Sequence, residues 1–194
     1  MASRPSLPPD YFEGMFRSTP DPWGFETKPY EQAKYDHTIS ALGGRRYASG
    51  LEVGCANGVL TQRLTAYCET LLAIDASTTA LSLAAKRCAE LTNVRFSEIT
   101  YPKGTLGSIA FDLIVLSEVV YYWSDDDITA AAVDIRSRLR PGGDIVLVHW
   151  TGDTDYPQSG DGAVAKLHAA LGDLMSVQTA ERRPEYRLDL WRRR

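Results

Sequence analysis

The feature that most constrains the fold of this chain is an alternation between short apolar runs and stretches with helical spacing. After Gly50, five apolar runs are separated by such stretches. Short apolar runs predict buried strands, and strands that alternate with helices are joined by right-handed crossovers in a parallel sheet. The chain is therefore predicted to adopt a doubly wound α/β fold. The predicted strands are 51–54, 70–75, 93–98, 111–116 and 144–150, and the predicted helices are 28–42, 57–67, 77–91, 125–139 and 162–171.

The two ends of the chain depart from this rhythm. Residues 1–29 hold six of the ten prolines and predict an irregular arm ahead of a capping helix. After residue 171, apolar and polar residues alternate on both sides of Pro184, which predicts an antiparallel strand pair that closes the sheet. We expect a Rossmann-like, mostly parallel, seven-stranded sheet in one domain over 1–194. Within it, the arm and capping helix occupy 1–43, the core 50–150, and the C-terminal helix and strand pair 151–194.

Charge and cysteine usage exclude several classes of function. The chain has 21 Lys and Arg against 25 Asp and Glu, a net charge of −4, so it lacks the basic field that phosphate backbones require. We therefore expect no nucleic-acid partner. No apolar run approaches the roughly 20 residues that cross a bilayer, which predicts a cytoplasmic protein without a membrane partner. The three cysteines form no CxxC pair, and we expect reduced thiols and no metal site.

The first predicted strand ends in a turn of small residues, Gly54-Cys55-Ala56-Asn57-Gly58. Small residues let a ligand approach the backbone, and the helix that follows offers unpaired N–H groups. The second strand ends in Asp75, 21 residues after Gly54, about where an acidic residue binds ribose hydroxyls. A tight strand-to-helix turn without a ligand is the alternative for the glycines alone. Together, the turn and Asp75 predict a site for an adenosyl cofactor.

The form of the turn distinguishes between adenosyl cofactors. Dinucleotide sites use GxGxxG, whereas this turn lacks the third glycine and follows an acidic residue, Glu52. The run Glu-Val-Gly-Cys-Ala-Asn-Gly resembles motif I of class I S-adenosylmethionine-dependent methyltransferases, with Ala56 where the middle glycine is usual. Further segments resemble later motifs of that class in the same order. They are IDAS (74–77), FSEI (96–99), FDLIVLSEV (111–119) and RPGG (140–143).

A narrower resemblance covers most of the chain. The segments DPWGFETKPYEQAKYDHTISAL, LSEVVYYW, VLVHW and EYRLDLW are similar to the NodS-like methyltransferases, named for a nodulation protein that N-methylates the free amine of a deacetylated chitooligosaccharide. This resemblance implies S-adenosylmethionine as cofactor and S-adenosylhomocysteine as product. The matched class I motifs and this narrower resemblance together imply the cofactor-binding residues, which are Trp23, Tyr30, Glu52, Gly54, Ala56, Gly58, Asp75, Ala76, Glu98, Ile99 (through its backbone N–H) and Ser117.

Methyl transfer requires an acceptor lone pair in line with the activated methyl, and an amine must arrive neutral. A nearby base helps by about 10²–10⁴-fold. Glu118 and His149 follow or end predicted strands, so both are expected at the carboxyl edge of the sheet as catalytic candidates. The alternatives are a solvated acid at a helix start for Glu118 and a buried, hydrogen-bonded strand histidine for His149.

Aromatic residues crowd the same predicted edge. Their faces attract cations and stack on sugar rings, which predicts substrate contacts for Tyr121, Tyr122 and Trp150. Simple core packing is the alternative, because LSEVVYYW continues a buried strand. The N-terminal arm, with Trp23 and Tyr30, must pack on the ligand edge of the sheet or elsewhere. The resemblance implies the ligand edge, where the arm would fold over the cofactor as a lid.

Three hypotheses follow for the function. The first is an N-methyltransferase that acts on an amino sugar or oligosaccharide, the small-molecule partner expected here. The second keeps the cofactor and changes the acceptor to a hydroxyl or to another natural-product amine. The third is a cofactor-binding module without catalysis, or a nicotinamide enzyme.

Overall fold

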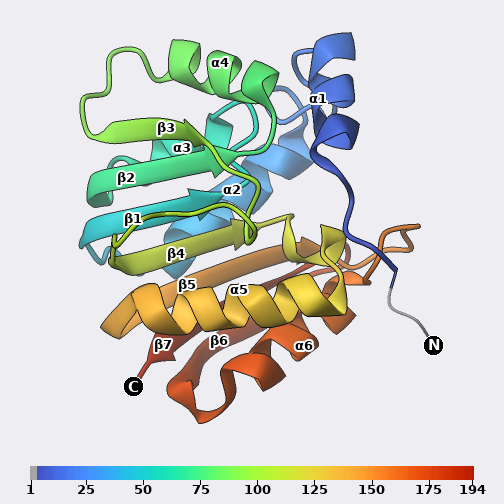
Figure 1. The fold of residues 1–194 in the computed structure, drawn as a ribbon. Coiled ribbons are helices and arrows are strands. Elements are labelled where there is room, and N and C mark those ends of the chain that lie inside the picture. The colour runs from blue at the N-terminus through green and yellow to red at the C-terminus, as the bar shows by residue number, and fades with distance from the viewer. Residues whose placement is uncertain (1–3) are drawn as a thin grey trace. The chain divides into compact units, whose positions relative to one another are not determined.

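The computed structural model describes residues 4–194 and has a mixed α/β architecture (Figure 1). Its seven strands form a sheet in the order β3-β2-β1-β4-β5-β7-β6. The pairs β1/β2, β2/β3 and β4/β5 are parallel, whereas β7 runs antiparallel to both β5 and β6. The predicted fold class, a mostly parallel sheet with an antiparallel C-terminal pair, is confirmed. The chain divides into two compact units, Pro8–Thr100 and Tyr101–Arg194 with the first residues up to Leu7.

The unit Pro8–Thr100 carries the first three strands of the sheet and four helices. Helix α4 packs on β2 and β3, α3 packs on β2, and α1 packs on α4. Val53 at the end of β1 is the register neighbour of Ile74, and the last residues of β2 and β3 are register neighbours of each other, so the three strands end at one edge. The elements are α1 (Pro9–Ser18), α2 (Pro29–Ala41), β1 (Tyr47–Val53), α3 (Val59–Leu64), β2 (Cys68–Asp75), α4 (Thr78–Arg87) and β3 (Val94–Glu98).

The unit Tyr101–Arg194 carries the other four strands. Helices α5 and α6 lie side by side, and α6 also packs on β5 and β7 (Figure 1). The central residues of β4 and β5 are fully buried, as expected for strands covered on both faces. The elements are β4 (Phe111–Ser117), η1 (Val120–Tyr122), α5 (Asp125–Arg138), β5 (Leu139–Trp150), α6 (Gly160–Leu171), η2 (Gly172–Leu174), β6 (Met175–Arg182) and β7 (Tyr186–Arg193).

The predicted arm over residues 1–29 is wrong in one part, because α1 forms at Pro9–Ser18. Proline is tolerated in the first helical turn, where its missing N–H has no intrahelical partner, so Pro8 and Pro9 begin this helix rather than break it. A second difference lies in β5, which begins at Leu139 and contains the predicted turn 140–143 as an irregularity in its pairing with β4. The single domain expected over 1–194 stays a prediction. No helix within residues 4–194 has the length and apolarity to cross a membrane.

Candidate functional site

The turn after β1 is built from residues with left-handed backbone. Gly54, Ala56 and Gly58 have φ of +74°, +51° and +82°. The N–H groups of Gly54 and Cys55 both donate to the Ile74 carbonyl, at 2.8 and 3.0 Å, which ties the turn to the end of β2. At Gly58 a Cβ would come within 2.9 Å of the Ala84 Cα on α4, so this position requires glycine both for its φ and for helix packing.

Asp75 joins the ends of β1 and β2. Its carboxylate accepts hydrogen bonds from the Ala56 N–H (2.9 Å to Oδ2) and the Ser77 N–H (2.9 Å to Oδ1). Burial raises the pKa of this carboxyl, and the backbone donors oppose that shift. The carboxylate therefore orders the turn, and each oxygen keeps a lone pair that can accept from a ligand.

Glu52 lies inside β1 and is only 2% exposed. Burial raises its pKa to about 8, the Thr61 hydroxyl lowers it, and the negative Asp75 raises it further. Among residues 4–194, no group donates a hydrogen bond to Glu52 Oε2. A buried acceptor of this kind next to the turn is a site for a donor that the protein itself does not provide.

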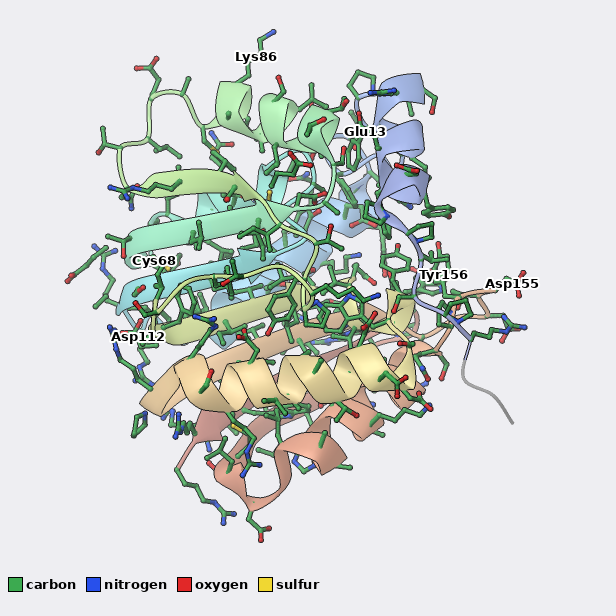
Figure 2. The ribbon with its side chains drawn as sticks, viewed as in Figure 1. Glu13, Cys68, Lys86, Asp112, Asp155 and Tyr156 are labelled. Atoms are coloured by element: carbon green, nitrogen blue, oxygen red, sulfur yellow. The ribbon has the colours of Figure 1, made fainter. Side chains whose placement is uncertain are left out.

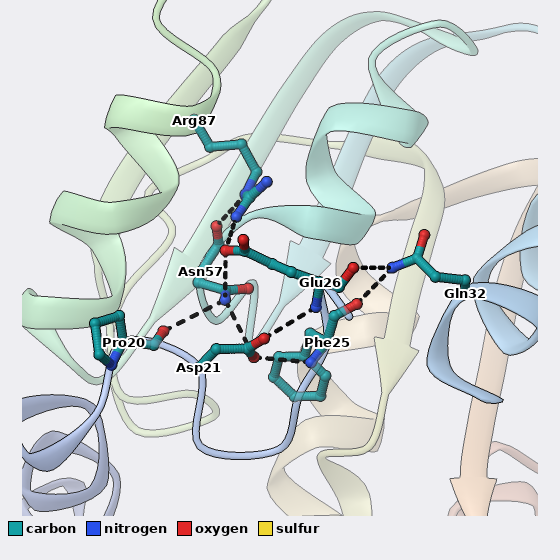
Figure 3. A network of polar contacts seen from close by, with 7 residues as sticks. All are labelled: Pro20, Asp21, Phe25, Glu26, Gln32, Asn57 and Arg87. Carbon is teal, nitrogen blue, oxygen red and sulfur yellow. Dashed lines mark hydrogen bonds and ion pairs between the residues drawn. The ribbon is translucent and has the colours of Figure 1, made fainter. Parts of the chain in front are cut away.

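Asn57, in the same turn, is the centre of a polar network (Figure 3). Its side-chain amide donates to the Pro20 carbonyl (3.4 Å) and to carboxylate oxygens of Asp21 (3.4 Å) and Glu26 (3.5 Å). Arg87 from α4 donates to the Asn57 carbonyl at 2.8 Å and pairs with Glu26. This network holds the segment before α2 against the turn. Asn57 Oδ1 is buried and, within the described chain, accepts no hydrogen bond.

Aromatic residues of the same segment pack on one another. Trp23 stacks on Phe25 with ring centroids 5.4 Å apart and meets Phe16 of α1 edge-on at 5.6 Å. Tyr30, at the start of α2, lies 5.1 Å from the Lys34 ammonium. Trp23 and Tyr30 are both half-buried, and their predicted contact with a cofactor stays a prediction.

A residue that the sequence did not single out connects α1 to this site. Glu13 of α1 accepts hydrogen bonds from the Ser77 hydroxyl (2.7 Å) and from the Thr79 hydroxyl (2.7 Å) and N–H (3.2 Å), at the start of α4 (Figure 2). Arg17 donates to the same carboxylate at 2.7 Å. These donors lower the pKa of Glu13 to about 2. The Ser77 N–H also donates to Asp75, so Ser77 links Glu13 to the residue that is predicted to bind the ribose.

Three residues at the ends of β2 and β3 were predicted to contact the adenine. Glu98 is exposed and is the register neighbour of Asp75, and Ala76 is half-buried. The backbone N–H of Ile99 donates to the Asp75 carbonyl at 3.0 Å. This N–H is engaged with the neighbouring strand in the ligand-free chain, and its predicted use for adenine stays a prediction.

In the unit Tyr101–Arg194, Glu118 directly follows the half-buried Ser117 at the end of β4 and has a left-handed φ of +57°. Its N–H donates to the Val148 carbonyl at 2.8 Å. Its Oε2 accepts the Tyr121 hydroxyl at 2.6 Å and the Trp150 N–H at 2.9 Å. Non-glycine residues in this backbone region are strained and cluster at functional sites.

His149 of β5 is fully buried, and its Nε2 accepts the Val120 N–H at 3.1 Å. An imidazole nitrogen that accepts carries no proton, so a neutral ring has its proton on Nδ1. The nitrogen that a base would use is therefore occupied by the first residue of η1. This geometry suits a residue that positions η1 more than one that takes a proton from an acceptor.

Three tyrosines form an aromatic cluster beside Glu118. Tyr121 meets Tyr122 edge-on at 4.6 Å and stacks on Tyr156 at 5.3 Å, and Tyr156 also meets Tyr122 at 4.7 Å. Burial raises the pKa of Tyr121 and Tyr122, so both phenols are neutral. Tyr156 follows β5 in a polar segment (Figure 2) and was not predicted; an isolated aromatic residue among polar ones was the available signal.

Residues 16–152 match the protein family described as Nodulation protein S (NodS). The chain belongs to the NodS family. The resemblance identified from the sequence is thereby confirmed. This NodS-family segment includes the glycine turn, Asp75, Glu118 and His149, whereas Glu13 and Tyr156 lie outside it.

Individual NodS proteins are similar over the same region. Nodulation protein S of Sinorhizobium fredii (strain NGR234) is 31% identical over 129 residues, which are 66% of this chain and 59% of that protein. The Bradyrhizobium diazoefficiens protein is 33% identical over 62% of this chain and 58% of its own length. The chain thus spans less than two thirds of these NodS relatives.

A solved NodS structure shares the fold. The crystal structure of the N-methyltransferase NodS from Bradyrhizobium japonicum WM9, in complex with S-adenosyl-L-homocysteine, has a TM-score of 0.82. The match covers 95% of this chain and 97% of that chain at 21% sequence identity. The architecture of the NodS family is therefore present across nearly the whole chain.

Proposed function

We propose that this chain is an S-adenosylmethionine-dependent methyltransferase that N-methylates the free amine of a small molecule, such as a deacetylated chitooligosaccharide or another amino sugar. The observation that carries the proposal is the pairing of the left-handed turn after β1 with Asp75 at the end of β2, in a chain of the NodS family. The NodS relative of known structure is an N-methyltransferase by its own description and binds S-adenosylhomocysteine.

The residues present fit this cofactor. The turn offers close backbone approach, and its neighbours Glu52 Oε2 and Asn57 Oδ1 are buried acceptors that lack a donor in the described part of the chain. The methionine part of the cofactor carries an ammonium group, which is the kind of donor these acceptors require. A pKa of about 8 means that the ligand-free Glu52 carboxyl holds a proton, and a nearby cation would favour its ionised form.

Each part of the cofactor site has candidate residues. Asp75 would accept from the ribose hydroxyls, while Ala76 and Glu98 would lie at the adenine. When bound, S-adenosylmethionine supplies a methyl group activated by its sulfonium. Within Pro8–Thr100, the network around Asn57 supports the interpretation that the segment carrying Trp23 covers this site.

The acceptor requires residues that hold an amine and take its proton. Glu118 is the candidate base, because its carboxylate is oriented by two donors and its strained backbone is typical of functional residues. Tyr121, Tyr122 and Trp150 surround it as candidates for acceptor contact. His149 stays a candidate through its support of η1, since its Nε2 is engaged.

The test is methyl transfer from S-adenosylmethionine to chitooligosaccharides that carry either a free or an N-acetylated terminal amine, read by mass spectrometry. We expect the mass of one or more methyl groups on the free-amine acceptor only, because an acetylated nitrogen has no basic lone pair. Transfer to both acceptors would point to a hydroxyl. Cofactor binding without transfer to either would reject the amino-sugar acceptor and keep the cofactor site.

A further inference from the structure

The carboxylate of Glu118 is held on one of its oxygens by two donors from different elements. The Tyr121 hydroxyl of η1 donates at 2.6 Å and the Trp150 N–H at the end of β5 donates at 2.9 Å, both to Oε2. Two donors on one oxygen fix the rotation of the carboxyl group, so its second oxygen has a defined direction. Hydrogen bonds to an ionised group are short and stronger than neutral ones.

The phenol that makes the shorter bond is itself held firmly. Tyr121 is 5% exposed, stacks on Tyr156 at an interplanar angle of 20°, and meets the His149 ring edge-on at 5.3 Å. Its carbonyl accepts the Gln158 N–H at 3.1 Å, which joins η1 to the segment that carries Tyr156. A side chain fixed on this many sides acts as support for its hydrogen-bond partner.

We propose that Tyr121 is a positioning residue for Glu118, and that Tyr156 holds Tyr121 in place. The phenol orients the carboxylate and stabilises its ionised form, so that Glu118 accepts the proton of the acceptor amine. This inference rests on the proposed function, and it assigns Tyr121 a role through its hydroxyl rather than through contact of its ring with a sugar.

The proton step balances without a further reactant. The N–H bond of an ammonium acceptor breaks, its electron pair stays on nitrogen, and the proton forms an O–H bond on Glu118. Tyr121 keeps its own proton throughout, because its phenol is buried and remains neutral at working pH. Glu118 then returns its proton to solvent.

Other titratable groups lie on η1 and on the elements around it. The rings of Tyr122, Tyr156 and His149 contact Tyr121, and burial raises the pKa of the Tyr122 phenol. Asp126 on α5 and Asp153 after β5 are exposed, and several other charged groups on and beside the neighbouring elements form ion pairs. Those pairs are Asp125 with Lys166, Asp161 with Arg182 and Arg187, Asp127 with Lys103, and Arg4 with Asp155.

The experiment compares Tyr121→Phe, which keeps the ring and removes the hydroxyl, with Tyr121→Leu, which removes both. For Tyr121→Phe we expect kcat for a free-amine acceptor to fall by about tenfold. The acidic limb of the kcat/KM profile should move up by about one pH unit, because the lost hydrogen bond favoured the ionised carboxylate. Affinity for S-adenosylhomocysteine should not change.

The matched control is Tyr101→Phe, which removes another buried tyrosine hydroxyl that donates to a carboxylate, Asp134, at 3.1 Å. This variant should leave the pH profile in place. An unaltered profile in Tyr121→Phe, together with a rise in acceptor KM in Tyr121→Leu, would overturn the proposal and assign the ring a contact role.

A second readout does not depend on turnover. Carbon-13 spectra of carboxyl-labelled glutamate, with the Glu118 signal assigned by Glu118→Gln, should show a higher Glu118 pKa in Tyr121→Phe than in the unmodified protein. An equal pKa would overturn the proposal. If the unmodified protein methylates no amine, the proposed function fails, and this titration still decides whether Tyr121 acts on Glu118.

Discussion

At the scale of single residues, Ala56 departs from the usual chemistry of its turn. Its φ of +51° lies in the left-handed region, where a Cβ costs roughly 1–2 kcal/mol. Glycine removes that strain but increases the entropy of the unfolded chain, which returns about 0.4–1 kcal/mol. We expect Ala56→Gly to raise the free energy of unfolding by about 0.5–1 kcal/mol in urea titrations.

The matched variant for that experiment is Gly58→Ala. It creates left-handed strain and also drives a Cβ to within 2.9 Å of Ala84, so it should destabilise the protein by about 2 kcal/mol or more. A loss of stability in Ala56→Gly would contradict the account of the turn.

Substitution of Glu118 tests its proposed role as the base. Glu118→Gln keeps the size of the side chain and removes its capacity to take a proton, so kcat should fall by about 10²–10⁴-fold. In calorimetry, Glu118→Gln should bind S-adenosylhomocysteine with the same affinity as the unmodified protein. Full turnover in this variant would remove Glu118 as the base.

Glu52 should make stability depend on pH. Its pKa is about 8 in the folded chain and near 4.5 when unfolded, so the folded state binds more protons between these values. Stability should therefore fall as pH rises from 4.5 to 8. We expect Glu52→Gln to be more stable than the unmodified protein at pH 8, to lose part of that advantage at pH 5, and to bind S-adenosylhomocysteine more weakly. If the difference in unfolding free energy between Glu52→Gln and the unmodified protein were the same at pH 5 and pH 8, folding would not change the pKa of Glu52.

At the scale of elements, one carboxylate attaches α1 to α4. Glu13 has a pKa lowered to about 2 by its donors on Ser77 and Thr79, so its contribution is complete above pH 4.5 and is lost as pH falls toward 2. Glu13→Gln should release α1 at neutral pH. Hydrogen exchange should then be faster in residues 9–18 and unchanged in β4 and β5. Equal exchange in residues 9–18 would mean that apolar contacts alone hold the helix.

The elements most accessible to sequence reasoning are those with strong local signals. The strand ends at Asp75 and Glu98 were predicted, because apolar runs act over a few residues. Helix α1 was missed because Pro8 and Pro9 indicate a break unless the helix begins with them. The irregular start of β5 was also missed, since only pairing with β4 extends that strand to Leu139.

At the scale of the whole molecule, the residues of the candidate site that local sequence signals mark could be predicted, and those placed by tertiary contacts could not. The glycine turn and Asp75 follow from spacing along the chain, and Glu118 follows from its place after a strand. Glu13 and Tyr156 contact their partners only in the folded chain. Glu13 and Ser77, for example, are 64 residues apart in the sequence. No local pattern carries such a contact.

If the turn after β1 and Asp75 bind S-adenosylmethionine, calorimetric titration should detect binding of the product S-adenosylhomocysteine. We expect saturable one-to-one binding to the unmodified protein and about 10- to 100-fold weaker binding to Asp75→Asn, because hydrogen bonds from the ribose hydroxyls to a charged group are lost. Glu69→Gln, which changes an exposed carboxylate on the same strand, should bind as the unmodified protein does. Undiminished affinity in Asp75→Asn would remove this residue from the site, and no binding to the unmodified protein would show that the turn after β1 is not a site for this cofactor.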